Sequence, residues 1–280
     1  MALYAFDGTW NEDEEDNVQN TNVWQFCTAL PEDMNVFYLE GVGTRGRLIG
    51  KLIGGLTGAG GRSRIDEALK KVDEYFSTGD RIIDIIGFSR GAALALHFAN
   101  QIQKKKDGAE IRFLGLWDTV ASFGIPGNRI DLGWDLTLPD NVKKCYHAIA
   151  LDERRGNFPV TRIKAPQGGL STEGRVQEVW FRGVHSDVGG GQCLGLSSIT
   201  LCWMLRRAKD NGLPVVEEKL KHHESLCDPS ATISKNFDPK LDPPRKIRTG
   251  DAVHASVQPR ERAGGKEHND PPQDVVIVEG

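Results

Sequence analysis

The 280-residue sequence has no basic excess, no paired cysteines and no long apolar segment. Its 35 lysines and arginines stand against 39 aspartates and glutamates, a formal net charge of −4, which argues against a nucleic-acid partner. Its five cysteines form no Cys-x-x-Cys pair, so neither a disulfide framework nor a zinc site is predicted. No apolar run approaches the roughly 20 residues that cross a bilayer, and the opening residues lack a secretory signal. We therefore expect a soluble chain that is synthesised in the cytoplasm.

Short apolar runs alternate with segments that carry apolar residues at helical spacing. The expected strands are 3–6, 36–39, 82–86, 111–117 and 179–184, and the expected helices are 22–30, 65–76, 92–103 and 196–209. This alternation predicts an α/β fold with a mainly parallel central sheet and helices on both faces.

The C-terminal part differs in composition, since seven of the 13 prolines fall in the last 60 residues. We expect one domain over residues 1–257, then an irregular, Pro-, Gly- and charge-rich tail over 258–280 that is free beyond Gly264. Residues 123–179 either form a cap insertion or complete the core.

The candidate nucleophile is Ser89, within Gly87-Phe88-Ser89-Arg90-Gly91. The G-x-S-x-G pattern alone is weak, but here an apolar strand precedes it and an Ala-rich helical run follows, which is the context of a nucleophile elbow. The alternative is that Gly87 and Gly91 merely permit a tight turn.

A serine nucleophile needs an imidazole base and a carboxylate that orients it. His185 follows an apolar strand and opens a loop that contains Gly189, Gly190 and Gly191, a placement typical of catalytic residues in open sheets. The alternative is a loop histidine bonded to Asp187. His254 is the reserve base, and His147 is expected in a helix.

For the acid, Asp118 ends the strand 111–117 and lies between Ser89 and His185 in the chain. This gives the order Ser, Asp, His of the α/β hydrolases. Asp187 is the alternative acid, although two residues from His185 it more easily bonds the backbone or orients the glycine turn.

The loop after the first strand, Asp7-Gly8-Thr9, is expected to supply an oxyanion donor. The N–H of Gly8 or Thr9 would act beside the N–H of Arg90, because the second donor of such a site comes from a strand-end loop near the elbow. The alternative is that Asp7 only caps the turn.

Residues 41–46 match the G-x-G-x-x-G fingerprint of nucleotide-binding sites. The helix that such a site requires is interrupted by glycines that follow within 50–61, so nucleotide binding is not favoured. Apolar residues between these glycines suggest either a flap over an acyl chain, spanning 41–61, or a loop packed on the core.

Taken together, six motifs in order along the chain resemble the catalytic domain of type VI secretion phospholipase effectors. They are 6–11 (FDGTWN), 41–44 (GVGT), 87–92 (GFSRGA), 116–120 (LWDTV), 150–155 (ALDERR) and 185–191 (HSDVGGG). The resemblance implies an α/β-hydrolase fold and an esterase triad of Ser89, Asp118 and His185. It also implies a lipid or small ester as substrate and transient contact with a membrane surface, and it leaves export by type VI secretion open.

Two other functions remain open from the sequence. Asp7, Asp118, His185 and Asp187 all lie at expected strand ends and would suit a divalent cation, as in a metal-dependent hydrolytic site. A hydrolase fold used only for binding is the third alternative. The triad itself requires no cofactor, and the sequence carries no indication of oligomeric state.

Overall fold

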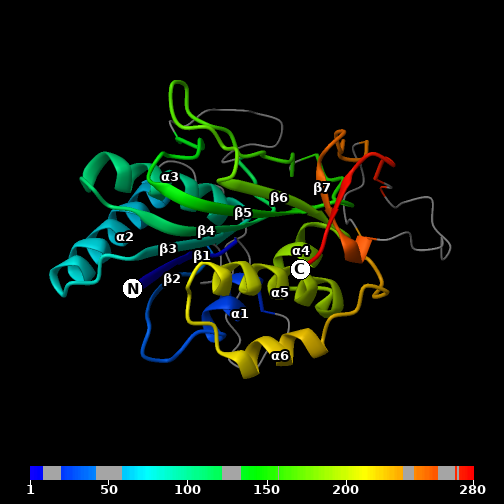
Figure 1. Cartoon of the computed structure of the whole chain (residues 1–280), viewed down its shortest axis with the longest axis horizontal. Coiled ribbons are helices and arrows are strands. Elements are labelled where there is room, and N and C mark those ends of the chain that lie inside the picture. The colour runs from blue at the N-terminus through cyan, green and yellow to red at the C-terminus, as the bar shows by residue number, and fades with distance from the viewer. Residues whose placement is uncertain are drawn as a thin grey trace.

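The computed structural model describes residues 1–8, 20–41, 59–121, 134–156, 158–235, 243–257, 269 and 271–280. Its centre is an eight-stranded sheet in the order β2-β1-β3-β4-β5-β6-β7-β8, and every neighbouring pair is parallel (Figure 1). The predicted α/β fold class with a mainly parallel sheet is confirmed.

The strands are β1 (Ala2–Phe6), β2 (Asn35–Leu39), β3 (Ile83–Phe88), β4 (Ile111–Trp117), β5 (Val142–Ala150), β6 (Val176–Phe181), β7 (Ala252–His254) and β8 (Val276–Val278). The helices are α1 (Asn22–Thr28), α2 (Ala59–Ser77), α3 (Arg90–Lys105), α4 (His185–Gly189), α5 (Leu194–Asp210) and α6 (Glu217–Ser225), with a 3₁₀ turn, η2, at Ala255–Val257. Among the described helices none is long and apolar enough to cross a membrane.

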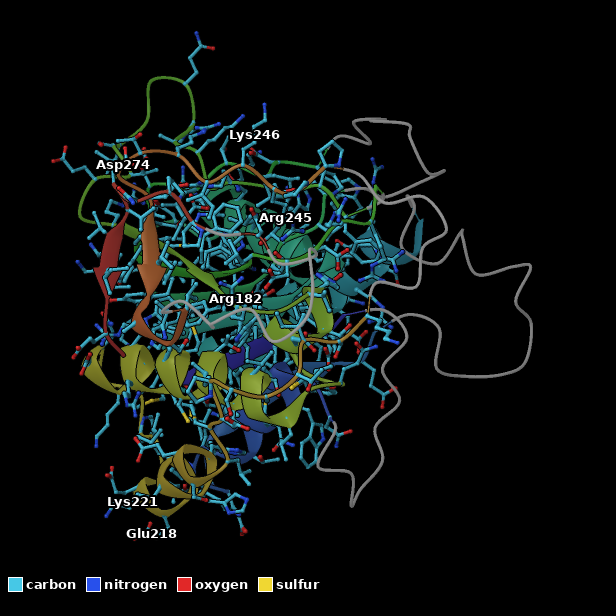
Figure 2. All side chains as sticks on the ribbon, turned by 90° about the vertical axis from the view of Figure 1, so that its right-hand side faces the viewer. Arg182, Glu218, Lys221, Arg245, Lys246 and Asp274 are labelled. Atoms are coloured by element: carbon cyan, nitrogen blue, oxygen red, sulfur yellow. The ribbon has the colours of Figure 1, made fainter. Side chains whose placement is uncertain are left out.

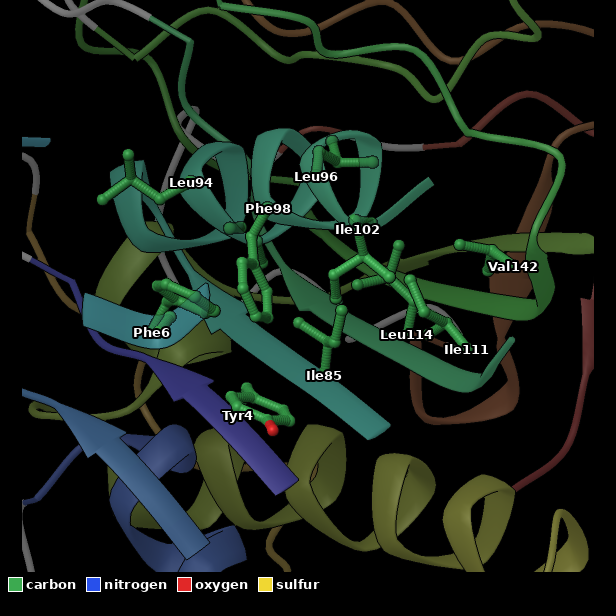
Figure 3. Packing of buried hydrophobic residues seen from close by; sticks show 14 of the residues in the cluster. Tyr4, Phe6, Ile85, Leu94, Leu96, Phe98, Ile102, Ile111, Leu114 and Val142 are labelled. Atoms are coloured by element: carbon green, nitrogen blue, oxygen red, sulfur yellow. The ribbon is translucent and has the colours of Figure 1, made fainter. Parts of the chain in front are cut away.

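Helices cover both faces of the sheet, and alternate side chains of each strand enter different layers. Tyr4 and Phe6 of β1 pack with Phe98 of α3, as Figure 3 shows. The same layer also contains residues of α2. Leu3 and Ala5 lie in the opposite layer, which includes residues of α1 and α5. Because β1, β3 and most of β4 are buried on both faces, the sheet centre is a rigid base for the loops at its carboxyl edge.

The prediction of a helix around His147 is wrong. That residue lies in β5, which pairs with β4 and β6 in the middle of the sheet. Lys143 and Lys144 are exposed at the start of the strand whereas its last four residues are buried. The segment 123–179, left open as cap or core, therefore contributes β5 and most of β6 to the central sheet.

The prediction that the chain is free beyond Gly264 is also wrong, because Val276–Val278 forms β8 and pairs with β7. Asn269 is held as well: its side-chain amide donates to the carbonyl oxygens of Leu151 and Arg245. Residues from both sides of the expected boundary at 257 thus contact the sheet.

Candidate active site

Ser89 lies in the tight turn between β3 and α3, with φ 59° and ψ −126°. A positive φ is strained for a residue with a side chain, and such strain concentrates at functional sites. The turn fits only because its flanks are glycines. A Cβ on Gly91 would lie 2.2 Å from the carbonyl oxygen of Phe6, and one on Gly87 would lie 2.8 Å from Cα of Ala92.

Three loops at the carboxyl edge of the sheet bring Ser89, His185 and Asp118 together. Nε2 of His185 lies 2.8 Å from Oγ of Ser89, and Nδ1 lies 2.6 Å from Oδ2 of Asp118. Ser89 follows β3, Asp118 follows β4, and His185 begins α4 after β6. A hydroxyl, an imidazole and a carboxylate therefore form one continuous hydrogen-bonded line, which is the arrangement that activates a serine.

The imidazole of His185 is held between two aromatic rings. The ring of Phe88 lies 4.6 Å away and that of Phe158 lies 4.8 Å away, centre to centre. The backbone N–H of His185 donates to Glu153, a buried carboxylate that is also paired with Arg155. Burial lowers the pKa of His185 below its ordinary value despite the neighbouring Asp118, which favours the neutral form that a general base requires.

The carboxylate of Asp118 is fully buried and carries a partner that sequence reasoning missed, Arg245. Nη1 of Arg245 donates to Oδ1 at 2.6 Å and Nη2 donates to Oδ2 at 3.2 Å, while the N–H of Ala150 donates to Oδ1 at 3.0 Å. Burial raises the pKa of Asp118, but Arg245 and His185 outweigh it, so that the pKa lies well below its ordinary value.

Asp187, the alternative acid, has a different role in the structure. Its carboxylate accepts from the backbone N–H of Val184 at the start of α4 and from the N–H and hydroxyl of Ser234. Burial raises its pKa. Among the described residues, the Asp187 carboxylate accepts hydrogen bonds from Val184 and Ser234, whereas the His185 ring bonds to Ser89 and Asp118. The geometry therefore does not favour the alternative of a loop histidine bonded to Asp187.

Asp7 organises the turn after β1. Oδ1 accepts from the N–H of Gly8 at 2.6 Å, and Oδ2 accepts from the hydroxyls of Thr21 at 2.6 Å and Tyr38 at 2.5 Å. Thr9 lies outside the described residues, as does nearly all of the expected flap and fingerprint, residues 42–58. The N–H of Arg90, the first residue of α3, has no acceptor within its own helix.

The two other histidines considered above lie apart from this line. Nδ1 of His254 lies 2.8 Å from Oγ of Ser256, and its ring stacks on Phe181. Nε2 of His147 accepts from the N–H of Thr119, which follows Asp118 in the chain. His147 therefore supports the loop that carries Asp118.

The four side chains considered for a divalent cation are not gathered into one site. Asp7, Asp118 and Asp187 each bind different partners, as described above. Among the described residues no group of three or more His, Cys, Asp or Glu side chains could hold a metal ion. The geometry therefore favours the triad over a metal site.

The family model described as "T6SS, Phospholipase effector Tle1-like, catalytic domain" matches residues 3–105 and 97–207. The chain belongs to this family. The resemblance drawn from the sequence motifs is confirmed, and the matched part of this Tle1-like chain contains Ser89, Asp118 and His185.

The Tle1-like chain is similar to two solved structures, of which the first shares its fold. An uncharacterized protein from Pseudomonas aeruginosa is 24% identical, with a TM-score of 0.57, over 80% of this chain and 48% of that chain. The Tle1-like chain thus spans about half of that protein's length. The NocB thioesterase domain, solved in covalent complex with a fluorophosphonate nocardicin G analogue, is 14% identical with a TM-score of 0.41, over 74% of this chain and 94% of that chain. No curated protein sequence matches the chain.

Proposed function

We propose that the chain is a serine hydrolase that cleaves carboxylic ester bonds of phospholipids through Ser89, His185 and Asp118. The observation that carries the proposal is the unbroken line from Oγ of Ser89 through the imidazole of His185 to the Asp118 carboxylate, with donor–acceptor distances of 2.8 and 2.6 Å. Membership of a phospholipase effector family supports a lipid substrate.

In the first step Nε2 of His185 takes the proton of Ser89 while Oγ attacks the ester carbonyl carbon. The negative charge that forms on the carbonyl oxygen is met by the N–H of Arg90 at the start of α3. A second donor comes from Gly8 or Thr9. Gly8 can serve only if its hydrogen bond to Asp7 opens.

The imidazolium then gives its proton to the leaving alcohol oxygen, and the acyl group stays on Ser89 as an ester. Water enters, loses a proton to His185 and attacks the acyl carbonyl. The bond from the acyl carbon to Oγ then breaks while His185 returns the proton to Oγ, which releases the fatty acid and restores Ser89 and the neutral imidazole. Asp118 remains ionised throughout, because it fixes the ring through Nδ1 and stabilises the imidazolium. No metal ion is needed for any of these steps.

Contact with a membrane surface during turnover, and delivery by type VI secretion, belong to the same proposal and rest on the family description. Phospholipids reside in bilayers, so the enzyme would meet its substrate at the lipid–water interface. Activity on vesicles compared with activity on a dispersed short ester measures this preference directly.

The test is the Ser89→Ala variant, with His254→Gln as the matched control for a buried polar residue outside the line. Both are assayed on phosphatidylglycerol and phosphatidylethanolamine vesicles, on the corresponding lysophospholipids and on 4-nitrophenyl butyrate. Ser89→Ala is expected to lose at least about 10³-fold in kcat, whereas His254→Gln keeps activity within a few-fold. Ser89→Ala activity within tenfold of the parent on every substrate would refute the proposal.

A second experiment distinguishes the serine mechanism from a metal-dependent mechanism. A fluorophosphonate probe is expected to label Ser89 in protein treated with a chelator, as mapped by peptide mass spectrometry, and the chelated protein is expected to keep its activity. Loss of activity on chelation without labelling of Ser89 would favour the metal-dependent alternative.

A further inference from the structure

Arg245 reaches the triad from the far end of the chain, 127 residues beyond Asp118. Its side chain is only 6% exposed, although both chain neighbours, Pro244 and Lys246, are exposed. Figure 2 shows Arg245 near the middle of the molecule and Lys246 closer to its upper rim. The peptide around Arg245 therefore lies at the surface while its guanidinium is inserted beneath it.

Among the described residues, the guanidinium of Arg245 donates its hydrogen bonds to Asp118 and to the backbone of two residues that contact Asp118 or His185. Besides the two bonds to Asp118, Nη1 donates to the carbonyl oxygen of Ala150 at 2.7 Å, and Nη2 donates to that of Phe158 at 2.7 Å. Ala150 also donates its N–H to Asp118, and the ring of Phe158 packs against His185. The side chain of Arg245 thus connects Asp118, the end of β5 at Ala150 and the residue, Phe158, whose ring packs on His185.

The arrangement also places a positive charge behind the carboxylate that faces His185. A bidentate arginine restricts the carboxylate more than a point charge does, because its two N–H groups match the two oxygens. Without Arg245, the Asp118 carboxylate would keep only its bonds to His185 and to the N–H of Ala150. It would rotate more freely and would favour the imidazolium more strongly. With Arg245 present, the negative charge that His185 meets is partly compensated.

We propose that Arg245 is a positioning residue of the triad, which holds the Asp118 carboxylate in line with His185 and makes protonation of the imidazole less favourable. This inference rests on the proposed serine mechanism and goes beyond it. Among the described residues, the charged groups that act most strongly on His185 are Asp118 after β4, Glu153 after β5 and Arg245 from the segment 243–251. Arg155 lies behind Phe158 and is paired with Glu153. Arg245 is therefore the cation nearest the acid of the triad among these groups.

The experiment compares Arg245→Met, which removes the charge, with Arg245→Lys, which keeps the charge but not the fork. The rate kcat/KM on 4-nitrophenyl butyrate is measured from pH 4.5 to 8.5. The acid limb of the kcat/KM profile is the range in which activity falls as the pH is lowered. For Arg245→Met its midpoint is expected to move up by about one pH unit, because the imidazole of His185 then keeps its proton to higher pH. Its kcat is expected to fall at least about tenfold with KM nearly unchanged. For Arg245→Lys we expect the midpoint of the acid limb to lie within about 0.3 pH units of the parent's midpoint. Its kcat is expected to be at least about fivefold lower than that of the parent.

Arg112→Met is the matched control. Arg112 donates two hydrogen bonds to the buried carboxylate of Asp84, near the amino ends of β4 and β3 and therefore at the opposite edge of the sheet from the triad. Its variant is expected to lose thermal stability with no movement of the acid limb. An unmoved limb in folded Arg245→Met, or an Arg245→Lys kcat equal to the parent, overturns the positioning role. If Arg245→Met does not fold, the Arg245→Lys kcat decides.

Ser89→Ala is assayed in parallel. An inactive Ser89→Ala together with an unmoved limb in Arg245→Met overturns only the role of Arg245. An active Ser89→Ala overturns the serine mechanism and with it the role of Arg245.

Discussion

The side chain of His185 is 6% exposed, and its burial lowers the pKa of the imidazole below the ordinary value near 6.5. In the proposed mechanism its neutral form is the base, so activity is expected to be lost as the pH falls through the pKa of His185 in the folded protein. We expect the acid limb of kcat/KM on a soluble ester to have its midpoint below pH 6.5. A midpoint at or above 6.5, measured under conditions where the protein stays folded, would contradict the burial argument.

Two aspartates at the carboxyl edge of the sheet, Asp118 after β4 and Asp187 in α4, are expected to differ in role, the first in catalysis and the second in stability. Asp118→Asn is expected to lower kcat by about 10²- to 10⁴-fold, because the amide no longer fixes the tautomer of His185. Asp187→Asn is expected to keep kcat within about tenfold and to lower the free energy of unfolding by about 1–3 kcal/mol, because the hydrogen bonds to Val184 and Ser234 weaken. Kinetics and urea unfolding of both variants check this. An Asp187→Asn variant with the larger loss in kcat would restore Asp187 as the acid.

At the scale of elements, the contact between α3 and β1 depends on the absence of a side chain at Gly91. An added Cβ would lie 2.2 Å from the carbonyl oxygen of Phe6 and 2.5 Å from that of Asp7, and both are backbone atoms. Gly91→Ala is therefore expected to lower the free energy of unfolding by about 3 kcal/mol or more, as in other overpacked sites, and to displace Ser89.

Gly108→Ala is the control for this prediction. Gly108 follows α3 with φ +68°, and a Cβ there meets nothing within 4 Å, so only backbone strain of about 1–2 kcal/mol is expected. Thermal unfolding and the labelling rate of Ser89 by a fluorophosphonate measure both effects. Equal losses in the two variants would show that the contact with β1 does not limit the packing of α3.

A strand or helix can be predicted from the sequence when the residues within it are enough to determine its structure. The strand 111–117 is an apolar run and was predicted to the residue, as the described β4 shows. The start of β5 carries two exposed lysines, and the segment becomes a strand through its pairing with β4 and β6. The sequence around His147 does not show this pairing, and the prediction of a helix there is wrong. β7 and β8 have three residues each, too few for a pattern.

The same reasoning applies to the candidate site. Ser89, Asp118 and His185 each follow an apolar strand, so the sequence could place them at one edge of the sheet. Arg245 lies beside two prolines in a segment without periodicity, and nothing local indicates that its side chain reaches Asp118. Its partner is fixed only by the tertiary course of the chain.

On the scale of the whole molecule, three half-buried or buried histidines outside the triad connect protonation to stability. Burial lowers the pKa of His97, His223 and His254 to about 4 each. Between pH 7 and 5 the unfolded chain therefore binds protons at these side chains that the folded protein does not bind. Stability is then present at neutral pH and is lost as the pH falls below about 6.5. Asp84 and Asp187, whose pKa values burial raises, oppose this trend.

We expect the free energy of unfolding to decrease from pH 7 to pH 5, by at most about 1.4 kcal/mol per pH unit for each proton taken up. Urea unfolding at pH 7, 6 and 5 measures the slope. The triple variant His97→Gln, His223→Gln and His254→Gln is expected to show a much smaller slope, whereas Ser230→Ala, at an exposed position, keeps that of the parent. The triad imidazole, whose pKa is also lowered, remains in the triple variant and leaves a residual slope of the same sign. A triple variant with the parental slope would mean that carboxylates, and not these histidines, govern the acid sensitivity of the fold.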